Sequence, residues 1–258
     1  MTARVRRYTP PALVFVLVLA GWELVVRAFD IQQFLLPRPS AIGQAFGDHL
    51  DELGVAGRNT LVEAIGGFAI GSVAAVAVAL VTARWTVASR TLMPFAIAAN
   101  SVPIIAFAPV MNNWFGVLNP LSKMMVVAIL VFFPVMINTV RGLTLVDPAA
   151  LELMRSYAAG EFTVLWKVRV PNALPYVFTA LKIGATLSLI GAIVAEYFGG
   201  QQFVLGQYII TEAAFFRFAN AWAAILVASA ASIVFFVIIV AIERVAIPWH
   251  ASTRSSDA

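Results

Sequence analysis

The sequence predicts an all-α, polytopic membrane protein with six transmembrane helices, from its composition, its apolar stretches and the placement of its charges. Of its 258 residues, 61% are hydrophobic and 12% are charged, and the mean hydropathy is +0.91. Soluble domains carry about 25% charged residues, so this chain has too little charge to cover a surface in water. Lipid, by contrast, requires an apolar exterior. The length fits one membrane domain over residues 1–258, with short connections between its helices.

Apolar stretches in the chain are long enough to cross a bilayer, which takes about 20 residues per helix. The first stretch could instead be a signal peptide, because Arg4, Arg6 and Arg7 precede it, but no convincing cleavage site follows. The third contains Pro103 and Pro109, so we expect it to be kinked or broken. The expected spans are Ala12–Phe29, Thr60–Ala83, Pro94–Val117, Leu121–Leu143, Pro175–Gly199 and Ala221–Ile247.

Basic residues gather on one side of the predicted membrane. If the N-terminus is cytoplasmic, the inner segments hold Arg4, Arg6, Arg7, Arg84, Arg90, Arg141, Arg155, Lys167, Arg169, Arg244 and Arg254. The outer segments hold only Arg27, Arg38, Arg58, Lys123 and Arg217, offset by Asp30, Asp48, Asp51 and Glu52. This bias predicts that both termini are cytoplasmic. The net charge of +4 then reports orientation, and we expect no nucleic-acid partner.

The residues that usually carry enzyme chemistry are scarce. The chain has no cysteine, which excludes disulfides, thiolate metal sites and cysteine nucleophiles. Its two histidines, His49 and His250, lie near opposite ends and favour a surface position. No G-x-x-x-x-G-K-[ST] motif is present, so the chain has no phosphate-binding loop of that kind. We therefore expect no catalytic residue, no metal ion and no cofactor.

The segment from residue 142 to residue 172, called the inner loop below, is the longest connection expected on the cytoplasmic side. Asp147-Pro148 is a good N-cap and first-turn pair, so we expect a helix from there to about Tyr157. After a pause at Ala158–Gly160, a second short amphipathic helix should continue to about Val168. The residues alone allow two interpretations, a rigid surface for a partner or a segment lying on the lipid headgroups.

The inner loop contains a spaced set of residues that has a counterpart in a known family. In order they are Glu152-Leu-Met, Ala158, Trp166, Val170-Pro171 and Leu174-Pro175, and we expect the two prolines to end the second helix before the fifth span. This set resembles the EAA loop of bacterial ABC importer permeases. That loop begins with Glu-Ala-Ala, followed by a glycine and later by Leu-Pro. Here Ala158 stands where the glycine is expected, with Gly160 two places later.

The resemblance extends over nearly the whole chain. It includes Leu36-Pro37-Arg38-Pro39, Val102-Pro103, Ala108-Pro109, Trp114-Phe115-Gly116, Phe132-Phe133-Pro134-Val135, Asn138-Thr139, Val146-Asp147-Pro148, Val194-Ala195-Glu196 and Leu205-Gly206. In this order the motifs are similar to those of the nitrate, sulfonate and taurine permeases. The resemblance implies the fold of type I ABC importer permeases and a location in the bacterial plasma (inner) membrane.

The resemblance also implies partners and coupling residues. The inner loop would dock into a separate ATP-binding-cassette ATPase, which would hydrolyse ATP, and an extracytoplasmic solute-binding protein would deliver the solute. A second copy of the chain would complete a homodimer in the lipid bilayer. Glu152 would make a charged contact, with Tyr157 and Phe162 as apolar anchors. The implied coupling set is Glu152, Arg155, Tyr157, Ala158, Gly160, Phe162 and Pro171.

Polar residues inside spans are costly and are the candidates for the translocation path: Asn100, Asn112, Asn113, Asn138 and Glu196. The adjacent Asn112 and Asn113 could line the path or cap a helix end. Glu196 could be a gate or docking contact, or a solvated helix end. Gly67 and Gly71 predict close helix packing within the chain.

Three charged side chains also lie near the predicted span ends. We expect Lys182 to extend to the inner membrane face, and we place Glu63 and Glu243 near helix ends.

The combined prediction is the permease subunit of an ABC importer. Because the asparagine pair suits a neutral heterocycle and no basic residue is evident midway through a span, we favour a pyrimidine-type vitamin precursor as solute. Nitrate, a sulfonate or taurine is the alternative within the family. A secondary transporter without an ATPase and an intramembrane enzyme are the alternatives outside it.

Overall fold

The computed structural model describes residues 2–83 and 86–249, without the side chains of residues 2–8, 11, 83 and 86–92. The basic side chains at Arg4, Arg6, Arg7, Arg84, Arg90 and Arg254, used above to predict orientation, therefore lie outside the description, as does His250. The described elements are α1 (Thr2–Ala28), α2 (Pro39–Asp48), α3 (Leu50–Ala83), α4 (Thr86–Asn100), η1 (Ile104–Phe107), α5 (Ala108–Phe115), α6 (Pro120–Thr144), α7 (Pro148–Ser156), α8 (Glu161–Val164), η2 (Leu165–Arg169), α9 (Val170–Tyr197), α10 (Leu205–Ala214) and α11 (Phe218–Ala246).

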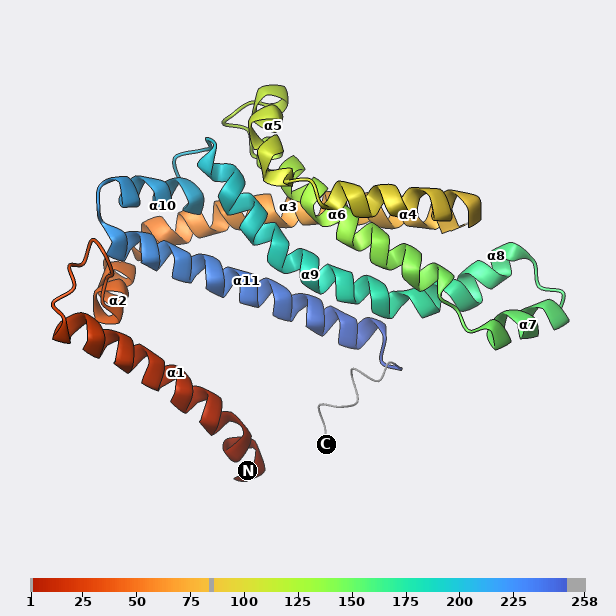
Figure 1. Cartoon of the computed structure of the whole chain (residues 1–258), viewed down its shortest axis with the longest axis horizontal. Coiled ribbons are helices and arrows are strands. Elements are labelled where there is room, and N and C mark those ends of the chain that lie inside the picture. Colours follow the sequence, from red (N-terminus) through yellow and green to blue (C-terminus); the bar gives the residue numbers. More distant parts are fainter. Residues whose placement is uncertain (1, 84–85, 250–258) are drawn as a thin grey trace.

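Four long helices run along the molecule and form its body (Figure 1). In the described residues, the helices long and apolar enough to cross a membrane are Leu50–Thr82, Pro120–Thr144, Glu161–Tyr197 and Phe218–Ala246. The largest group of buried apolar side chains lies mainly between α3, α6 and α9, and includes Val127, Val131 and Leu189. The second span begins ten residues earlier than predicted, at Leu50 instead of Thr60.

Glycines on α3 let α6 approach its backbone closely. A Cβ atom on Gly67 would lie 2.5 Å from the Met124 carbonyl oxygen, and one on Gly71 would lie 2.4 Å from that of Ala128. Real Cβ atoms do not approach that closely, so larger residues at these two positions would separate the helices. The predicted packing of the two glycines within the chain is confirmed.

The third expected span is broken, as its prolines predict. Met93–Asn100 and Ile104–Phe115 meet at an angle of 80°, and taken together as one bent span they raise the candidate spans in the described residues from four to five. Residues 101–103, which join the two pieces, are not helical. The first expected span coincides with α1, which is not among those five. The count of six spans therefore stays a prediction.

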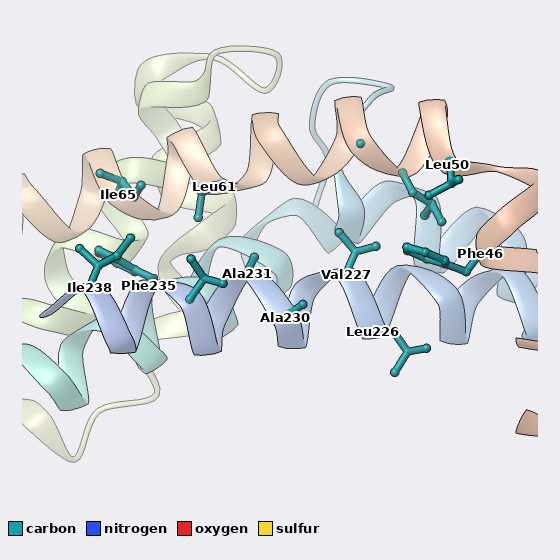
Figure 2. A pocket seen from close by; sticks show the side chains of 13 residues that line it. Phe46, Leu50, Leu61, Ile65, Leu226, Val227, Ala230, Ala231, Phe235 and Ile238 are labelled. Carbon is teal, nitrogen blue, oxygen red and sulfur yellow. The ribbon is translucent and has the colours of Figure 1, made fainter. Parts of the chain in front are cut away.

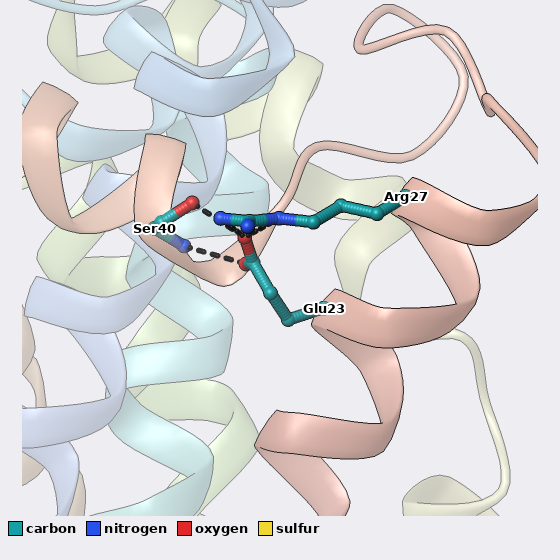
Figure 3. A network of polar contacts seen from close by, with 3 residues as sticks. All are labelled: Glu23, Arg27 and Ser40. Atoms are coloured by element: carbon teal, nitrogen blue, oxygen red, sulfur yellow. Dashed lines mark hydrogen bonds and ion pairs between the residues drawn. The ribbon is translucent and has the colours of Figure 1, made fainter.

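Helix α1 is joined to the other helices by contacts at its C-terminal end. Glu23 accepts hydrogen bonds from Ser40 N (3.1 Å) and Ser40 Oγ (2.8 Å), and it pairs with Arg27 (Figure 3). The Trp22 ring meets Trp222 of α11 edge-on, with 5.3 Å between the ring centres. Beyond these contacts α1 diverges from the body of the molecule (Figure 1).

The second helix of the inner loop does not end before the fifth span, and this part of the sequence prediction is wrong. Helix α8, the π turn η2 and α9 form one continuous helix from Glu161 to Tyr197. In the π turn the Val170 N–H bonds to the Leu165 carbonyl, five residues back. Pro171 follows directly, in the first turn of α9, where the hydrogen-bond pattern changes back and its missing N–H is tolerated.

A cleft of about 660 Å³ opens between α3 and α11, with Phe46 of α2 at one end (Figure 2). Its lining residues are all apolar, among them Leu50, Leu61, Val227 and Phe235. Solute sites combine apolar walls with a few polar groups that fix orientation. This cleft offers no polar side chain, so the candidate path lies elsewhere.

Candidate functional site

The inner loop is pinned at its base, where the end of α6 meets the start of α9. Asn172 Nδ2 donates to the carbonyl oxygens of Gly142 (2.8 Å) and Leu145 (3.0 Å). A Cβ atom on Gly142 would lie 2.7 Å from the Cα of Ala173, so the two helices touch at this level. The loop therefore leaves the molecule from a fixed base and projects from one end of it (Figure 1).

Helix α7 begins where the sequence predicts. Asp147 Oδ1 accepts a hydrogen bond of 2.9 Å from Ala149 N, and Pro148 occupies the first turn. The helix ends at Ser156, and Ala158 follows with a φ of +50°. A positive φ places the Cβ in steric conflict with its own backbone, and only glycine avoids that cost. This backbone angle explains why the resembled motif has a glycine at the position of Ala158.

Several apolar side chains of the inner loop are exposed at its surface. Tyr157 and Phe162 are each 74% exposed, and Leu153 and Trp166 are exposed as well. The rings of Phe162 and Trp166 meet edge-on, 6.1 Å apart. The predicted residues Glu152, Arg155 and Gly160 nearby are exposed too, whereas Pro171 is half-buried at the base.

Within the described part of the chain, the side chains of Glu152 and Arg155 make no hydrogen bond or ion pair. A surface that combines exposed apolar side chains with unpaired charges is typical of a site where another protein docks.

Two of the predicted path residues lie on the exposed face of the bent span. Asn100 ends α4 and Asn113 lies in α5, and both side chains are exposed. Asn138 is half-buried on α6 and donates 2.8 Å to the Pro134 carbonyl of its own helix. The three asparagines therefore do not form one polar cluster with each other.

Asn112, in contrast, is buried, and both polar atoms of its side chain are hydrogen-bonded within the protein. Its side-chain oxygen accepts 3.0 Å from Lys123 Nζ, and its side-chain nitrogen donates 3.1 Å to the Phe198 carbonyl. Lys123 Nζ also donates to the Val117 carbonyl, in the turn after α5. Because Asn112 is buried and its amide is bonded to Lys123 and to the Phe198 carbonyl, the asparagine-pair argument for a heterocycle loses one of its two exposed amides.

Glu196 lies at the centre of the same buried region. Its Oε2 atom accepts a hydrogen bond from Gly206 N and its main-chain carbonyl accepts from Gln207, whereas Oε1 is buried with no hydrogen-bond partner among the described residues. The residue is 0% exposed, which excludes the interpretation as a solvated helix end. Thr60 Oγ1 accepts 2.9 Å from Leu205 N.

Glu63 completes this region, which is called the outer cluster below: Thr60, Glu63, Asn112, Lys123 and Glu196. The Glu63 and Glu196 carboxyl groups lie close together, and both interact electrostatically with Lys123. Exposure is 3% for Glu63 and 1% for Lys123. The cluster thus joins α3, α5, α6 and α9 through buried charge.

Sequence reasoning missed the two charged partners of Glu196. Lys123 was counted among the outer surface charges, and Glu63 was placed near a helix end. The burial of Glu63 could have been expected if the second span had been predicted to start at Leu50, because Glu63 then lies well inside α3. Lys182 bonds both oxygens of Glu243, near the end of α11, at 3.0 and 2.8 Å, and its extension to the inner membrane face stays a prediction.

In the described residues, no group of three histidine or acidic side chains could hold a metal ion. The arrangement therefore offers two features with chemical meaning. One is an exposed surface suited to a protein partner at the end where the inner loop projects. The other is a buried, charged cluster that fastens the outer piece of a broken span.

Known proteins are similar to this chain over most of its length. Residues 58–249 match the family model described as binding-protein-dependent transport system inner membrane component. The formylaminopyrimidine transport permease protein ThiX of Halalkalibacterium halodurans is 29% identical over 241 residues, which cover 93% of this chain and 95% of that protein. The riboflavin transport system permease protein RibX of Chloroflexus aurantiacus is 28% identical over a segment that covers 96% of this chain and 94% of that protein. The taurine transport system permease protein TauC of Escherichia coli is 28% identical over a segment that covers 59% of this chain and 55% of that protein.

Proposed function

The chain belongs to the family of binding-protein-dependent transport system inner membrane components, and from this premise we propose how it moves a solute. Membership makes it a non-catalytic permease subunit of an ABC importer and a multi-pass protein of the inner membrane. An ATPase and a solute-binding protein are the partners that such a system implies. The alternatives of a secondary transporter and an intramembrane enzyme are thereby set aside.

The observation that carries the proposal is the bent span. Residues 101–103 are unwound, and Asn100 and Asn113 are exposed on either side of the bend. Hydrocarbon cannot satisfy open backbone or amide groups, so non-helical backbone at membrane depth has to be covered by protein or line a water-filled space. We propose that a second copy of the chain covers this face, and that the translocation path runs between the two copies.

In this arrangement each copy crosses the membrane six times, with α1 and the bent span included. Both termini then lie in the cytoplasm, on the side where the inner loop projects. The path is lined by Asn100 and Asn113, and Asn138 faces it from α6. This topology agrees with the distribution of basic residues along the chain.

The inner loop is the proposed coupling surface for the ATPase. Tyr157 and Phe162 are the apolar anchors, and Glu152 and Arg155 provide charged contacts beside them. Truncating an anchor of this kind typically costs more than about 2 kcal/mol of binding free energy. Because α8 continues into α9, movement of the docked loop moves a whole membrane helix.

A co-purification experiment tests the coupling surface. We expect Glu152→Lys combined with Tyr157→Ala to reduce the ATPase recovered with the tagged permease by at least tenfold. The matched control is Asp51→Lys combined with Phe29→Ala, which makes the same kinds of change on exposed residues at the other end of the molecule. Undiminished ATPase recovery and ATP-driven uptake in the Glu152 variant would refute the assignment.

For the solute we propose a pyrimidine-type vitamin precursor, with riboflavin, nitrate, a sulfonate or taurine as alternatives. Support comes from the relatives named for formylaminopyrimidine and riboflavin transport, which align over 93% and 96% of this chain, whereas the taurine relative aligns over 59%. Calorimetry on the purified solute-binding protein, titrated with formylaminopyrimidine, riboflavin, taurine, an alkylsulfonate and nitrate, tests this choice. Binding of an anion alone would contradict it.

A further inference from the structure

Lys123 holds the outer piece of the bent span in place. We propose that it is a positioning residue, which fixes α5 against α6 and α9 and thereby keeps the outer end of the path closed. This inference rests on the proposed function, because α5 lines a path only if the two copies meet there. Lys123 itself is 1% exposed and does not touch the solute.

The contacts of Lys123 reach α5 from both sides of its C-terminal end. Its Nζ atom bonds the Asn112 side chain within α5 and the Val117 carbonyl just beyond it. Asn112 passes the connection on to the Phe198 carbonyl, after the end of α9. The polar contacts act beside an apolar one, because Ala108 and Met111 of α5 pack with Val126 of α6 and Ala195 of α9.

The carboxyl groups of Glu63 and Glu196 lie near the ammonium group and attract it electrostatically, although neither is within ion-pair distance. A buried ammonium is tolerated only when opposite charges and hydrogen bonds compensate its lost hydration. Glu63 comes from α3 and Glu196 from the last turn of α9, so Lys123 is fixed relative to both helices. An α5 that moved away would have to leave its contact with Lys123 behind.

Helix α9 connects this cluster to the inner loop. Glu196 lies at the outer end of the continuous helix that starts at Glu161 in the inner loop. When the ATPase displaces the loop, the helix carries the Glu196 carboxyl group and the Phe198 carbonyl with it. We expect this displacement to break the Asn112–Phe198 bond and to release α5 from its closed position.

A labelling experiment tests the positioning role, and the absence of native cysteine makes it direct. Asn113→Cys places a single thiol on the exposed face of α5. In the full permease–ATPase complex in nanodiscs without nucleotide, we expect Lys123→Met to raise the rate of modification by a membrane-impermeant maleimide at least tenfold. Lys123→Arg should restore most of the protection, because it keeps the charge and the donors.

The matched control is Lys182→Met, which removes the lysine of the Lys182–Glu243 ion pair, away from α5. It should leave the labelling rate unchanged. Equal rates in the parent and in Lys123→Met would overturn the proposal. ATPase co-purification is measured on the same samples, so a loss of the complex, which bears on the proposed function, is seen separately.

A cysteine pair tests the proposal without removing Lys123. A Cβ atom on Gly199 would lie 2.8 Å from Val117 Cγ1, so Val117→Cys with Gly199→Cys brings two thiols close together. Because Gly199 has a φ of +114°, its cysteine strains the backbone, and oxidation rates are therefore compared only within this one double variant, with and without the trapped ATPase. We expect the oxidation rate in the complex to fall at least tenfold when the ATPase is trapped with MgATP and vanadate. The two single-cysteine variants control for links between copies. An unchanged oxidation rate in a complex that still contains its ATPase would overturn the inference and leave the proposed function standing.

Discussion

The inner loop and the outer cluster lie at opposite ends of one continuous helix, and they treat their functional side chains in opposite ways. In the inner loop, Tyr157 and Phe162 are each 74% exposed, and Glu152 has no partner within the described chain. In the outer cluster, Lys123 and Glu196 are buried and bonded within the chain. One end therefore leaves its apolar and charged side chains exposed, whereas the other end buries its charged side chains close to one another within a single subunit.

The largest expected effect on stability comes from comparing one charge substitution at each end of the helix. Lys123→Met should lower the free energy of unfolding by about 3–5 kcal/mol, because it leaves two buried carboxyl groups without their cation. For a protein of this size that corresponds to a fall in Tm on the order of 10 °C. Glu152→Lys should change stability by less than about 0.5 kcal/mol, since its side chain is exposed. Thermal unfolding in detergent measures both, and equal Tm shifts would erase the distinction.

A second test compares one glycine from each end. A Cβ atom on Gly206 would lie 2.5 Å from the Ile193 carbonyl and 2.6 Å from the Glu196 Cβ. Gly206→Ala should therefore cost about 1–3 kcal/mol by overpacking. A Cβ atom on Gly160 meets nothing within 4 Å, so Gly160→Ala should cost less than about 1 kcal/mol, from the weaker N-cap alone. The same thermal assay applies, and a larger loss for Gly160→Ala would contradict the packing described.

The smallest expected effect is a gain in stability. Ala158 has a φ of +50°, and glycine removes the steric cost of that conformation, so Ala158→Gly should stabilise the inner loop by about 1 kcal/mol. Backbone amides of α7 and α8 should then exchange hydrogen several-fold more slowly, as measured by mass spectrometry. Ala159→Gly is the control, because Ala159 does not have a positive φ. Slower exchange in both variants, or in neither, would count against the conformational explanation.

Local signals in the sequence predicted the features that depend on neighbouring residues. Asp147-Pro148 marks the start of α7, Pro103 and Pro109 mark the broken span, and the Gly67–Gly71 spacing marks the contact of α3 with α6. Each depends on backbone geometry within a few residues, which the residue types control directly. The exposure of Tyr157 and Phe162 also agrees with the docking role that the resemblance implies.

The outer cluster could not be predicted in the same way, because its members come from distant parts of the chain. Lys123 follows Pro120 and Ser122 near the start of a helix, which is typical of a solvated end. Its burial depends on Asn112, Glu63 and Glu196 from three other helices. Placing the start of the second span at Thr60 also hid Glu63, since a carboxyl group one turn from a helix end raises no expectation of burial.

The π turn at Leu165–Arg169 fixes the angular phase between the inner loop and the rest of the molecule. A π turn contains one more residue than the α turn that it replaces, and each residue of an α-helix advances the chain by about 100°. Deleting a single residue there would restore regular α geometry and swing the loop about the helix axis by roughly that angle. An inner loop transferred between related permeases would therefore need the same number of residues in this segment, whatever its side chains are. We expect chimeras joined between Gly160 and Pro171 to transport solute only when that number is kept.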